Sequence, residues 1–514
     1  MRPGSPLFAI LALLIGACSA QAASDAPLER GTAIIDPGAL RELDGGRFGL
    51  AHIMAHARPT DQAMTNEQLF ALSSMAQVAK ALDADFAHYI ERHKAELPNE
   101  SIGVGASFAL QLFDRAQLYS ADTRFALAGI VNRMDRGYVA AKNCGEIRLI
   151  YRLTQTHAAA IGEAGVTPRL PMTLNVVLKA KGDGNEITCA EMARRWLAAA
   201  GLNVTGAEFA DKLMAPGGAL ELLRPEDVDR IETNLQIAHA PKSAVRDFRT
   251  DYLMKVFKYD ASSGTFVEAP LEDQIDRELL SKDDKLAREF KAWLLAPEHF
   301  AELDRGTVLI PDKFLAKAAI APTPAGFVPS ELMPAYGLVA GEGARPVFTE
   351  DDVVGALEKA AKRGVALQNI RSVAGFARRL NDVSCAGCHQ TRGIGGFHFP
   401  GVDWMAATPS NTLVVPASPH FFGDQVRRRD ILAAFRDGKS PDFSKGFASR
   451  PQLRGSTELA GTEYEDGWGA HCYVQQPRAN ENDRSFRSWT CAEGLACEPT
   501  APGTRMGMCF VKTR

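Results

Sequence analysis

The sequence predicts an α+β protein of several domains: a mixed α/β N-terminal region, a mainly α-helical region and a small disulfide-rich C-terminal module. The first observation is an alternating, strand-like pattern, in which apolar Ile147, Leu149 and Tyr151 are interleaved with Arg148 and Arg152. The second is a helical spacing of apolar residues late in the chain, directly after a capping threonine. The third is a group of cysteines near the C-terminus, which is typical of a small disulfide-stapled module.

Length and composition set the frame for these parts. With 514 residues, 46 % of them hydrophobic and 23 % charged, the chain resembles ordinary globular proteins and is long enough for several cores. A net charge of −4 gives no basic surface, so we expect no nucleic-acid partner. The predicted parts are a signal peptide over 1–22, a helical region over 24–120, a mixed α+β domain over 121–335, a mainly helical domain over 350–465 and a disulfide-rich tail over 466–514.

The N-terminal segment has the features of an export signal. Arg2 gives a positive start, and the apolar run Leu7 to Ile15 is too short to span a bilayer as a mature helix. Ile15-Gly16-Ala17-Cys18 resembles a bacterial lipobox, which implies that Cys18 becomes the lipidated first residue and, with Ser19 behind it, that the anchor lies in the outer membrane. The alternative is ordinary cleavage after Ala20-Gln21-Ala22. Both interpretations predict export to the periplasm or the outer membrane.

The next two regions are predicted from caps and strand patterns. Thr65-Asn66-Glu67-Gln68 fits a capping box, and the helix that it begins ends at Leu97-Pro98. Asp135, Arg136 and Glu146 lie close together in sequence, and we expect them to form surface ion pairs. Strands are expected over 147–153, 172–180, 234–238, 252–259 and 265–268, and the last two form a hairpin.

The later half of the chain is predicted to be mainly helical. A Gly- and Ala-rich linker over 337–346 precedes Thr349, which caps a helix with three acidic residues in its first turn. A second helix, from about Leu367 to Leu380, leads into the motif Cys385-Ala386-Gly387-Cys388-His389. Two thiols at this spacing can each add to one vinyl group of a porphyrin, and the adjacent imidazole can then bind the iron.

This motif resembles the haem-attachment site of c-type cytochromes. The resemblance implies a cytochrome c-like haem domain over 350–465 with one covalent haem c, held by thioether bonds to Cys385 and Cys388, with His389 as the proximal iron ligand. Two alternatives remain open for the thiols: a Cys385–Cys388 disulfide or half of a zinc site.

The second axial ligand of the iron is left open. Met405, His398 and His420 are the candidates within reach of the motif, and an open sixth position is a further possibility. Arg427-Arg428-Arg429 is expected to form a solvated helix face; the alternative is a surface that steers an acidic redox partner.

Six cysteines remain after the lipidation and haem assignments, and their spacing suggests how they pair. Cys144 and Cys189 stand alone together, so we expect a bridge between them. The other four lie in the tail and are expected to form two bridges there, with a connectivity that the sequence leaves open: Cys472, Cys491, Cys497 and Cys509.

Together these features predict an exported mono-haem c-type cytochrome, anchored to the membrane by lipid, that exchanges electrons with a redox partner protein or a small-molecule donor or acceptor. One alternative is an enzyme, a haem-dependent, peroxidase-like oxidoreductase. The other is a haem-free envelope interaction protein in which Cys385 and Cys388 form a disulfide. The sequence shows no catalytic motif that decides between them.

Overall fold

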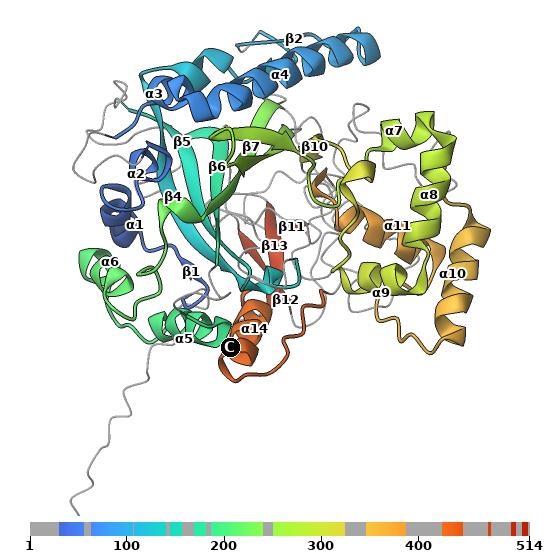
Figure 1. The fold of residues 1–514 in the computed structure, drawn as a ribbon. Coiled ribbons are helices and arrows are strands. Elements are labelled where there is room, and N and C mark those ends of the chain that lie inside the picture. Colours follow the sequence, from blue (N-terminus) through green and yellow to red (C-terminus); the bar gives the residue numbers. More distant parts are fainter. Residues whose placement is uncertain are drawn as a thin grey trace, which may run out of the picture.

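The computed structural model of the chain describes residues 30–55, 63–105, 107–139, 144–156, 169–180, 187–239, 250–323, 346–386, 424–445, 471–473, 495–499 and 506–511. Helices and strands are both well represented, and they are arranged around a large, mainly antiparallel sheet (Figure 1). The chain is therefore a mixed α/β protein, in agreement with the sequence.

The described part of the large sheet has ten strands. The order β1-β4-β5-β6-β7-β3-β2 forms its main path, while β8 pairs with β7, β9 and β10. All of these pairs are antiparallel except β2 with β3. The strands are β1 (Ala33–Ile34), β2 (Ile102–Gly103), β3 (Leu110–Leu112), β4 (Thr123–Arg133), β5 (Glu146–Gln155), β6 (Arg169–Lys179), β7 (Val228–His239), β8 (Thr250–Asp260), β9 (Thr265–Ala269) and β10 (Ala318–Thr323).

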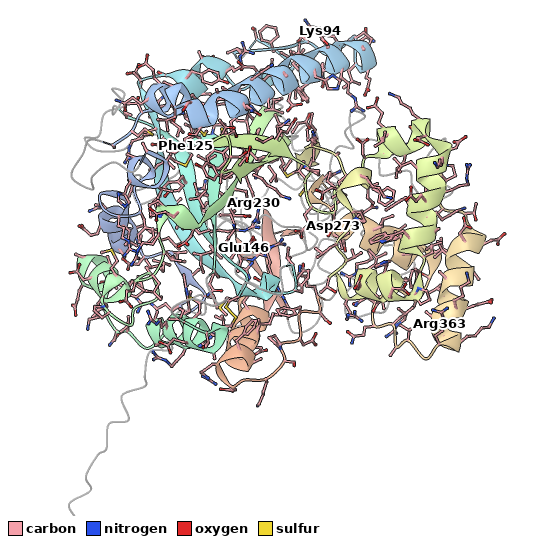
Figure 2. All side chains as sticks on the ribbon, viewed as in Figure 1. Lys94, Phe125, Glu146, Arg230, Asp273 and Arg363 are labelled. Carbon is pink, nitrogen blue, oxygen red and sulfur yellow. A yellow bond between two sulfur atoms is a disulfide. The ribbon has the colours of Figure 1, made fainter. Side chains whose placement is uncertain are left out.

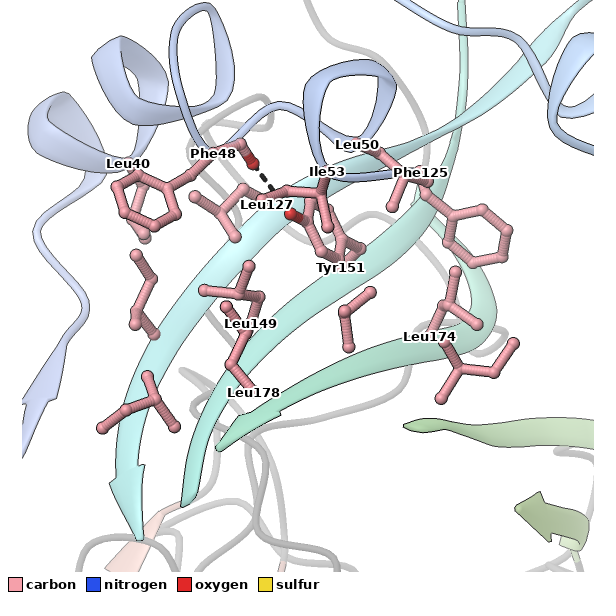
Figure 3. Close-up of a cluster of buried hydrophobic side chains, with 14 of the residues drawn as sticks. Leu40, Phe48, Leu50, Ile53, Phe125, Leu127, Leu149, Tyr151, Leu174 and Leu178 are labelled. Atoms are coloured by element: carbon pink, nitrogen blue, oxygen red, sulfur yellow. Dashed lines mark hydrogen bonds between the residues drawn. The ribbon is translucent and has the colours of Figure 1, made fainter. Parts of the chain in front are cut away.

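One face of this sheet carries the main hydrophobic core, because successive strand residues point to opposite sides. Leu149 and Tyr151 of β5 belong to the apolar side, where the Tyr151 hydroxyl donates a hydrogen bond to the Phe48 carbonyl oxygen at 2.8 Å (Figure 3). Besides the strands, Met134 and Leu432 contribute to this core, as do residues of α1 (Pro37–Asp44), α2 (Leu50–Ala55), α3 (Asn66–Ala71), η1 (Ser73–Met75), α4 (Ala76–Glu96), η2 (Arg115–Tyr119), α5 (Cys189–Ala199) and α6 (Gly206–Met214).

The predicted capping box is confirmed at the start of α3. The Thr65 hydroxyl accepts from the Gln68 amide, and the Gln68 side chain accepts from the Thr65 amide. Side chains of α1 to α4 pack into the same core as β4 to β7. The helical region and the first half of the mixed region therefore fold around one shared core.

A second hydrophobic core lies within a group of helices beside the sheet (Figure 1). Phe300 of α9 stacks on Phe376 of α11, and Phe348, just before α10, packs edge-on against the same ring. Helices that the sequence assigns to two different regions therefore share one core. The elements are α7 (Arg277–Lys282), α8 (Asp284–Leu294), α9 (Pro297–Arg305), η6 (Asp312–Phe314), α10 (Glu350–Lys362) and α11 (Val373–Asp382).

The C-terminal part contributes one helix and a small sheet to the described structure. Helix α14 (Gln425–Arg436) packs against α5 and against the short turn η3 (Met134–Arg136) that follows β4. Strand β13 (Met506–Val511) lies between β11 (His471–Tyr473) and β12 (Leu495–Pro499) in an antiparallel three-stranded sheet.

Candidate functional site

Helix α11 leads to the first cysteine of the motif. The Ser372 hydroxyl caps the helix by accepting from the Gly375 amide, and the helix ends at Asp382, three residues before Cys385. Cys385 is buried with 4 % of its surface exposed, and its Sγ lies 3.8 Å from the Glu272 carbonyl oxygen. Cys388 and His389, the other predicted haem-binding residues, lie outside the described residues.

The segment 272–274 is the described partner of the motif. The Gln274 side-chain oxygen accepts from the Ala386 amide at 2.9 Å. Asp273 adopts a positive φ of 55°, a conformation that aspartate tolerates better than most residues, and its Oδ1 accepts from the Ile310 amide at 3.0 Å. This turn is held from both sides, so it fixes the position at which α11 delivers Cys385.

Buried ion pairs continue from this segment across the second face of the sheet. Arg136 forms a two-fold contact with the Glu272 carboxylate and also pairs with Glu146 at 2.6 Å. Glu146 in turn contacts Arg148 at 2.7 Å, and it also pairs with Arg230. We call the whole set the ion-pair network: Arg133, Asp135, Arg136, Glu146, Arg148, Arg230, Glu232, Glu272, Asp424, Arg427 and Arg428.

The network corrects two expectations from the sequence. Asp135, Arg136 and Glu146 were expected at the surface, yet each is less than 9 % exposed. Arg428, expected on a solvated helix face, is only 2 % exposed. Both errors have the same cause. Regularly spaced polar residues show that a strand or helix has a polar face, but they do not show whether water or another part of the chain covers that face. Figure 2 shows Glu146 and Arg230 in the middle of the molecule.

Guanidinium groups keep the carboxylates of the network ionised. Burial alone would raise the pKa of Glu146, but Arg136, Arg230 and Arg148 lower it well below the ordinary value. The pKa of Asp135 is lowered in the same way, against its burial, by Arg133, Arg428 and Arg427.

The Lys445 amine is a further titratable group close to the ion-pair network. Its Nζ lies 3.3 Å from the Tyr138 hydroxyl and 5.5 Å from the centre of the Tyr138 ring. Burial, with help from the nearby Arg427, lowers the pKa of Lys445 to about 7. Burial and the Glu272 charge raise the pKa of Asp273 well above its ordinary value. The pKa of Lys445 therefore lies near neutral pH, and pKa values shifted in this way are common in active sites.

Cys385 belongs to a cluster of buried apolar residues on the same face of the sheet. This cluster is rich in alanine and comprises Ala33, Val131, Ile150, Met254, Val256, Ala269, Leu271, Ala319, Ala321, Cys385 and Ala386. Ile150 pairs in register with Asn175, whose side-chain oxygen and nitrogen are buried with no hydrogen-bond partner in the described structure. The Thr173 hydroxyl and the Gln236 side-chain nitrogen of the same face also lack one. Such orphaned polar groups indicate a place for water or a ligand.

Two features of this face bear on whether a haem could be held here. A macrocycle attached at Cys385 needs an apolar surface beside the thiol, and its propionates need cationic or hydrogen-bonding groups. The alanine-rich cluster is apolar and the ion-pair network contains guanidinium groups, so both kinds of group are present on this face of the sheet. The described part of the chain contains no group of three or more His, Cys, Asp or Glu residues that could hold a metal ion by themselves.

The remaining predicted positions are the disulfide cysteines, the lipidated cysteine and the candidate iron ligands. Cys144 and Cys189 are joined in a disulfide, which confirms the predicted pair. In the small sheet, Cys497 lies directly opposite Cys509 in the backbone register, and Cys472 lies opposite Gly507. Opposing residues of an antiparallel pair are about 4.5–5.5 Å apart, a separation that a disulfide can span. Outside the described residues are Cys18, His398, Met405, His420 and Cys491.

No helix in the described ranges is both long and apolar enough to cross a bilayer. Comparison with known proteins returned no matching family model, no matching curated protein and no matching solved structure.

Proposed function

We propose that this chain is an exported, lipid-anchored mono-haem c-type cytochrome that transfers single electrons. The observation that carries the proposal is the motif Cys385-Ala386-Gly387-Cys388-His389, whose spacing suits two thioether bonds and one iron ligand. Cys385 and Cys388 would hold the haem, and His389 would bind its iron. The bound haem would supply the redox chemistry, in which the iron takes up and releases one electron.

Three features of the fold support the proposal. The Cys385 thiol is buried, so an attached group would be shielded from water, which helps a protein to set a reduction potential. The thiol belongs to an apolar cluster, which is the kind of surface that a porphyrin ring packs against. The ion-pair network offers guanidinium groups on the same face of the sheet.

Covalent haem can be tested directly. The full chain is expressed with an export signal in a host that attaches haem c, and the denatured protein is examined by its absorbance in alkaline pyridine and by its mass. We expect a haem that remains bound after denaturation, and only partial attachment in Cys385→Ser and Cys388→Ser. Ser384→Ala is the matched control and should retain full attachment. A colourless protein whose mass shows Cys385 disulfide-linked to Cys388 would refute the proposal.

The second axial ligand is tested with the same material. Met405→Ala, His398→Ala and His420→Ala are compared by their ferric and ferrous spectra. The variant that removes the ligand should change from a low-spin to a high-spin spectrum, while the other two keep the wild-type spectrum. A high-spin wild-type protein would instead show that the sixth position is open.

A haem-dependent oxidoreductase is the second candidate, and one observation favours it. Lys445 has a pKa of about 7 beside the Tyr138 hydroxyl, as a general acid–base group near neutral pH would require. In an enzyme of this kind, Lys445→Met would reduce peroxide turnover about 100-fold or more without loss of haem. An electron carrier would show no peroxide turnover to reduce.

Export and anchoring form a separate part of the proposal. The Cys18 thiol would carry the lipid, and the redox partner would be a protein or a small molecule of the cell envelope. Cells fed labelled palmitate should label the wild-type chain but not Cys18→Ser. A wild-type chain that carries no label and is cleaved after Ala22 would favour ordinary signal cleavage.

A further inference from the structure

Within the described part of the chain, two of the three guanidinium nitrogens of Arg428 have no hydrogen-bond acceptor. Its Nε donates to the Asp424 carboxylate at 2.9 Å, but Nη1 and Nη2 are buried and have no hydrogen-bond partner among the described residues. Nη1 of the neighbouring Arg427 is in the same situation. Arg427 already donates Nε to Asp424 and Nη2 to Asp135, so both arginines share carboxylates and still have donors to spare.

An arrangement of this kind is costly unless something negative completes it. A guanidinium removed from water needs acceptors for its five N–H groups, and a buried charge without them is strongly unfavourable. Burial and the adjacent Arg133 lower the pKa of Arg428 from its ordinary value. Both arginines also lie in the first turns of α14, at the positive end of its dipole. All of these contributions favour an anion at the free ends of Arg427 and Arg428.

We propose that Arg428 and Arg427 form a buried binding site for an oxyanion, that is, a carboxylate or a phosphate group. Planar guanidinium groups bind such anions through paired hydrogen bonds, and the unused Nη atoms provide the donors. The anion has two possible sources: a propionate of the haem, in which case the inference rests on the proposed function, or a free oxyanion. Asp135, which pairs with Arg427, and Arg136, which pairs with Glu272, are neighbours in η3, and the Glu272 carbonyl lies beside Cys385. A propionate is consistent with this layout.

Inorganic phosphate is the probe, and the thermal unfolding midpoint of the full chain is the readout. Phosphate is compared with chloride at equal ionic strength, in protein with haem and in the haem-free variant Cys385→Ser/Cys388→Ser. The same series is run with Arg428→Met and with the matched control Arg436→Met, which removes an exposed arginine from the same helix. We expect phosphate to raise the midpoint of the haem-free protein by several degrees, equally in Arg436→Met, and not in Arg428→Met.

The two sources give different results in the haem-loaded protein. With a propionate in the site, phosphate leaves the midpoint unchanged, and Arg428→Met lowers the reduction potential while Arg436→Met does not. With a free oxyanion as the ligand, phosphate raises the midpoint with or without haem. The inference is overturned when phosphate has no effect on the haem-free chain, or raises the Arg428→Met midpoint just as much. If no haem attaches at all, the proposed function fails. The wild-type chain is then itself the haem-free sample, and the phosphate series still tests the oxyanion site.

Discussion

The two faces of the large sheet are built from the same strands but by opposite physical means. On β5, Leu149 and Tyr151 face a core of aliphatic and aromatic side chains, whereas Glu146 and Arg148 face the ion-pair network. Both faces are buried. The apolar face gains stability from every side chain that it removes from water, in proportion to area. The charged face is stable only as a complete set, because each charge that loses its partner is left uncompensated in the interior. A protein that needs only stability has little reason to keep such a face, so the comparison points to function on the charged side.

The largest effect is expected on the charged face at Glu146. This carboxylate contacts Arg136, Arg148 and Arg230, so Glu146→Ala would leave two buried guanidinium groups and one partly buried one short of an acceptor. We expect the free energy of unfolding to fall by about 3–5 kcal/mol. Urea unfolding measures it, with Glu42→Ala on the exposed side of α1 as the control. A loss no larger than about 1 kcal/mol, typical of a surface pair, would show that water reaches the network.

A smaller loss is expected on the apolar face. Leu149 is fully buried in the main core, so Leu149→Ala should cost about 3 kcal/mol through lost burial and the cavity that it leaves. Leu309, which is 36 % exposed, is the control, and Leu309→Ala should cost much less. If Leu149→Ala proved more damaging than Glu146→Ala, the ranking of the two faces would be reversed.

Tyr151→Phe tests a polar contact within the apolar face. The change removes the hydroxyl that donates to the buried Phe48 carbonyl at 2.8 Å and keeps the ring (Figure 3). We expect a loss of about 1–2 kcal/mol, because the carbonyl would be left without that donor. Tyr259→Phe, at a position 43 % exposed, should have almost no effect. Equal stability of wild type and Tyr151→Phe would mean that a water replaces the hydroxyl.

The same contrast explains how much of the fold the sequence could predict. Period-2 patterns located β5, β6 and the β8–β9 hairpin, and caps located α3 and α10, because those signals are local. The grouping of the helices was beyond reach, since α9 and α11 meet through Phe300 and Phe376, which are far apart in the chain.

The candidate site shows the same limit more sharply. The motif around Cys385 and the pair Cys144–Cys189 could be found, because both depend on spacing and on cysteine counts. The burial of Arg136 and Arg428 could not be predicted from the sequence, because it depends on which distant segments cover one face of the sheet. The alternation of Arg148 and Arg152 with apolar residues even favoured the wrong answer, because that pattern is typical of an antiparallel strand with one face in water.

The smallest effect should come from the edge of the network, where it approaches Cys385. Burial would raise the pKa of Glu272, but Arg136 lowers it from 4.5 to about 2. A carboxyl whose pKa is depressed in the folded state contributes stability above about pH 4.5 and loses that contribution as the pH falls towards 2. Glu272→Gln should therefore be modestly less stable at pH 6 and should lose less further stability between those two pH values. Because Glu272 is partly exposed, the difference should stay below that of Glu146→Ala. Urea midpoints measured across this pH range, with Glu42→Gln as control, would test it, and an unchanged slope in Glu272→Gln would mean that the carboxylate does not pair with Arg136 in solution.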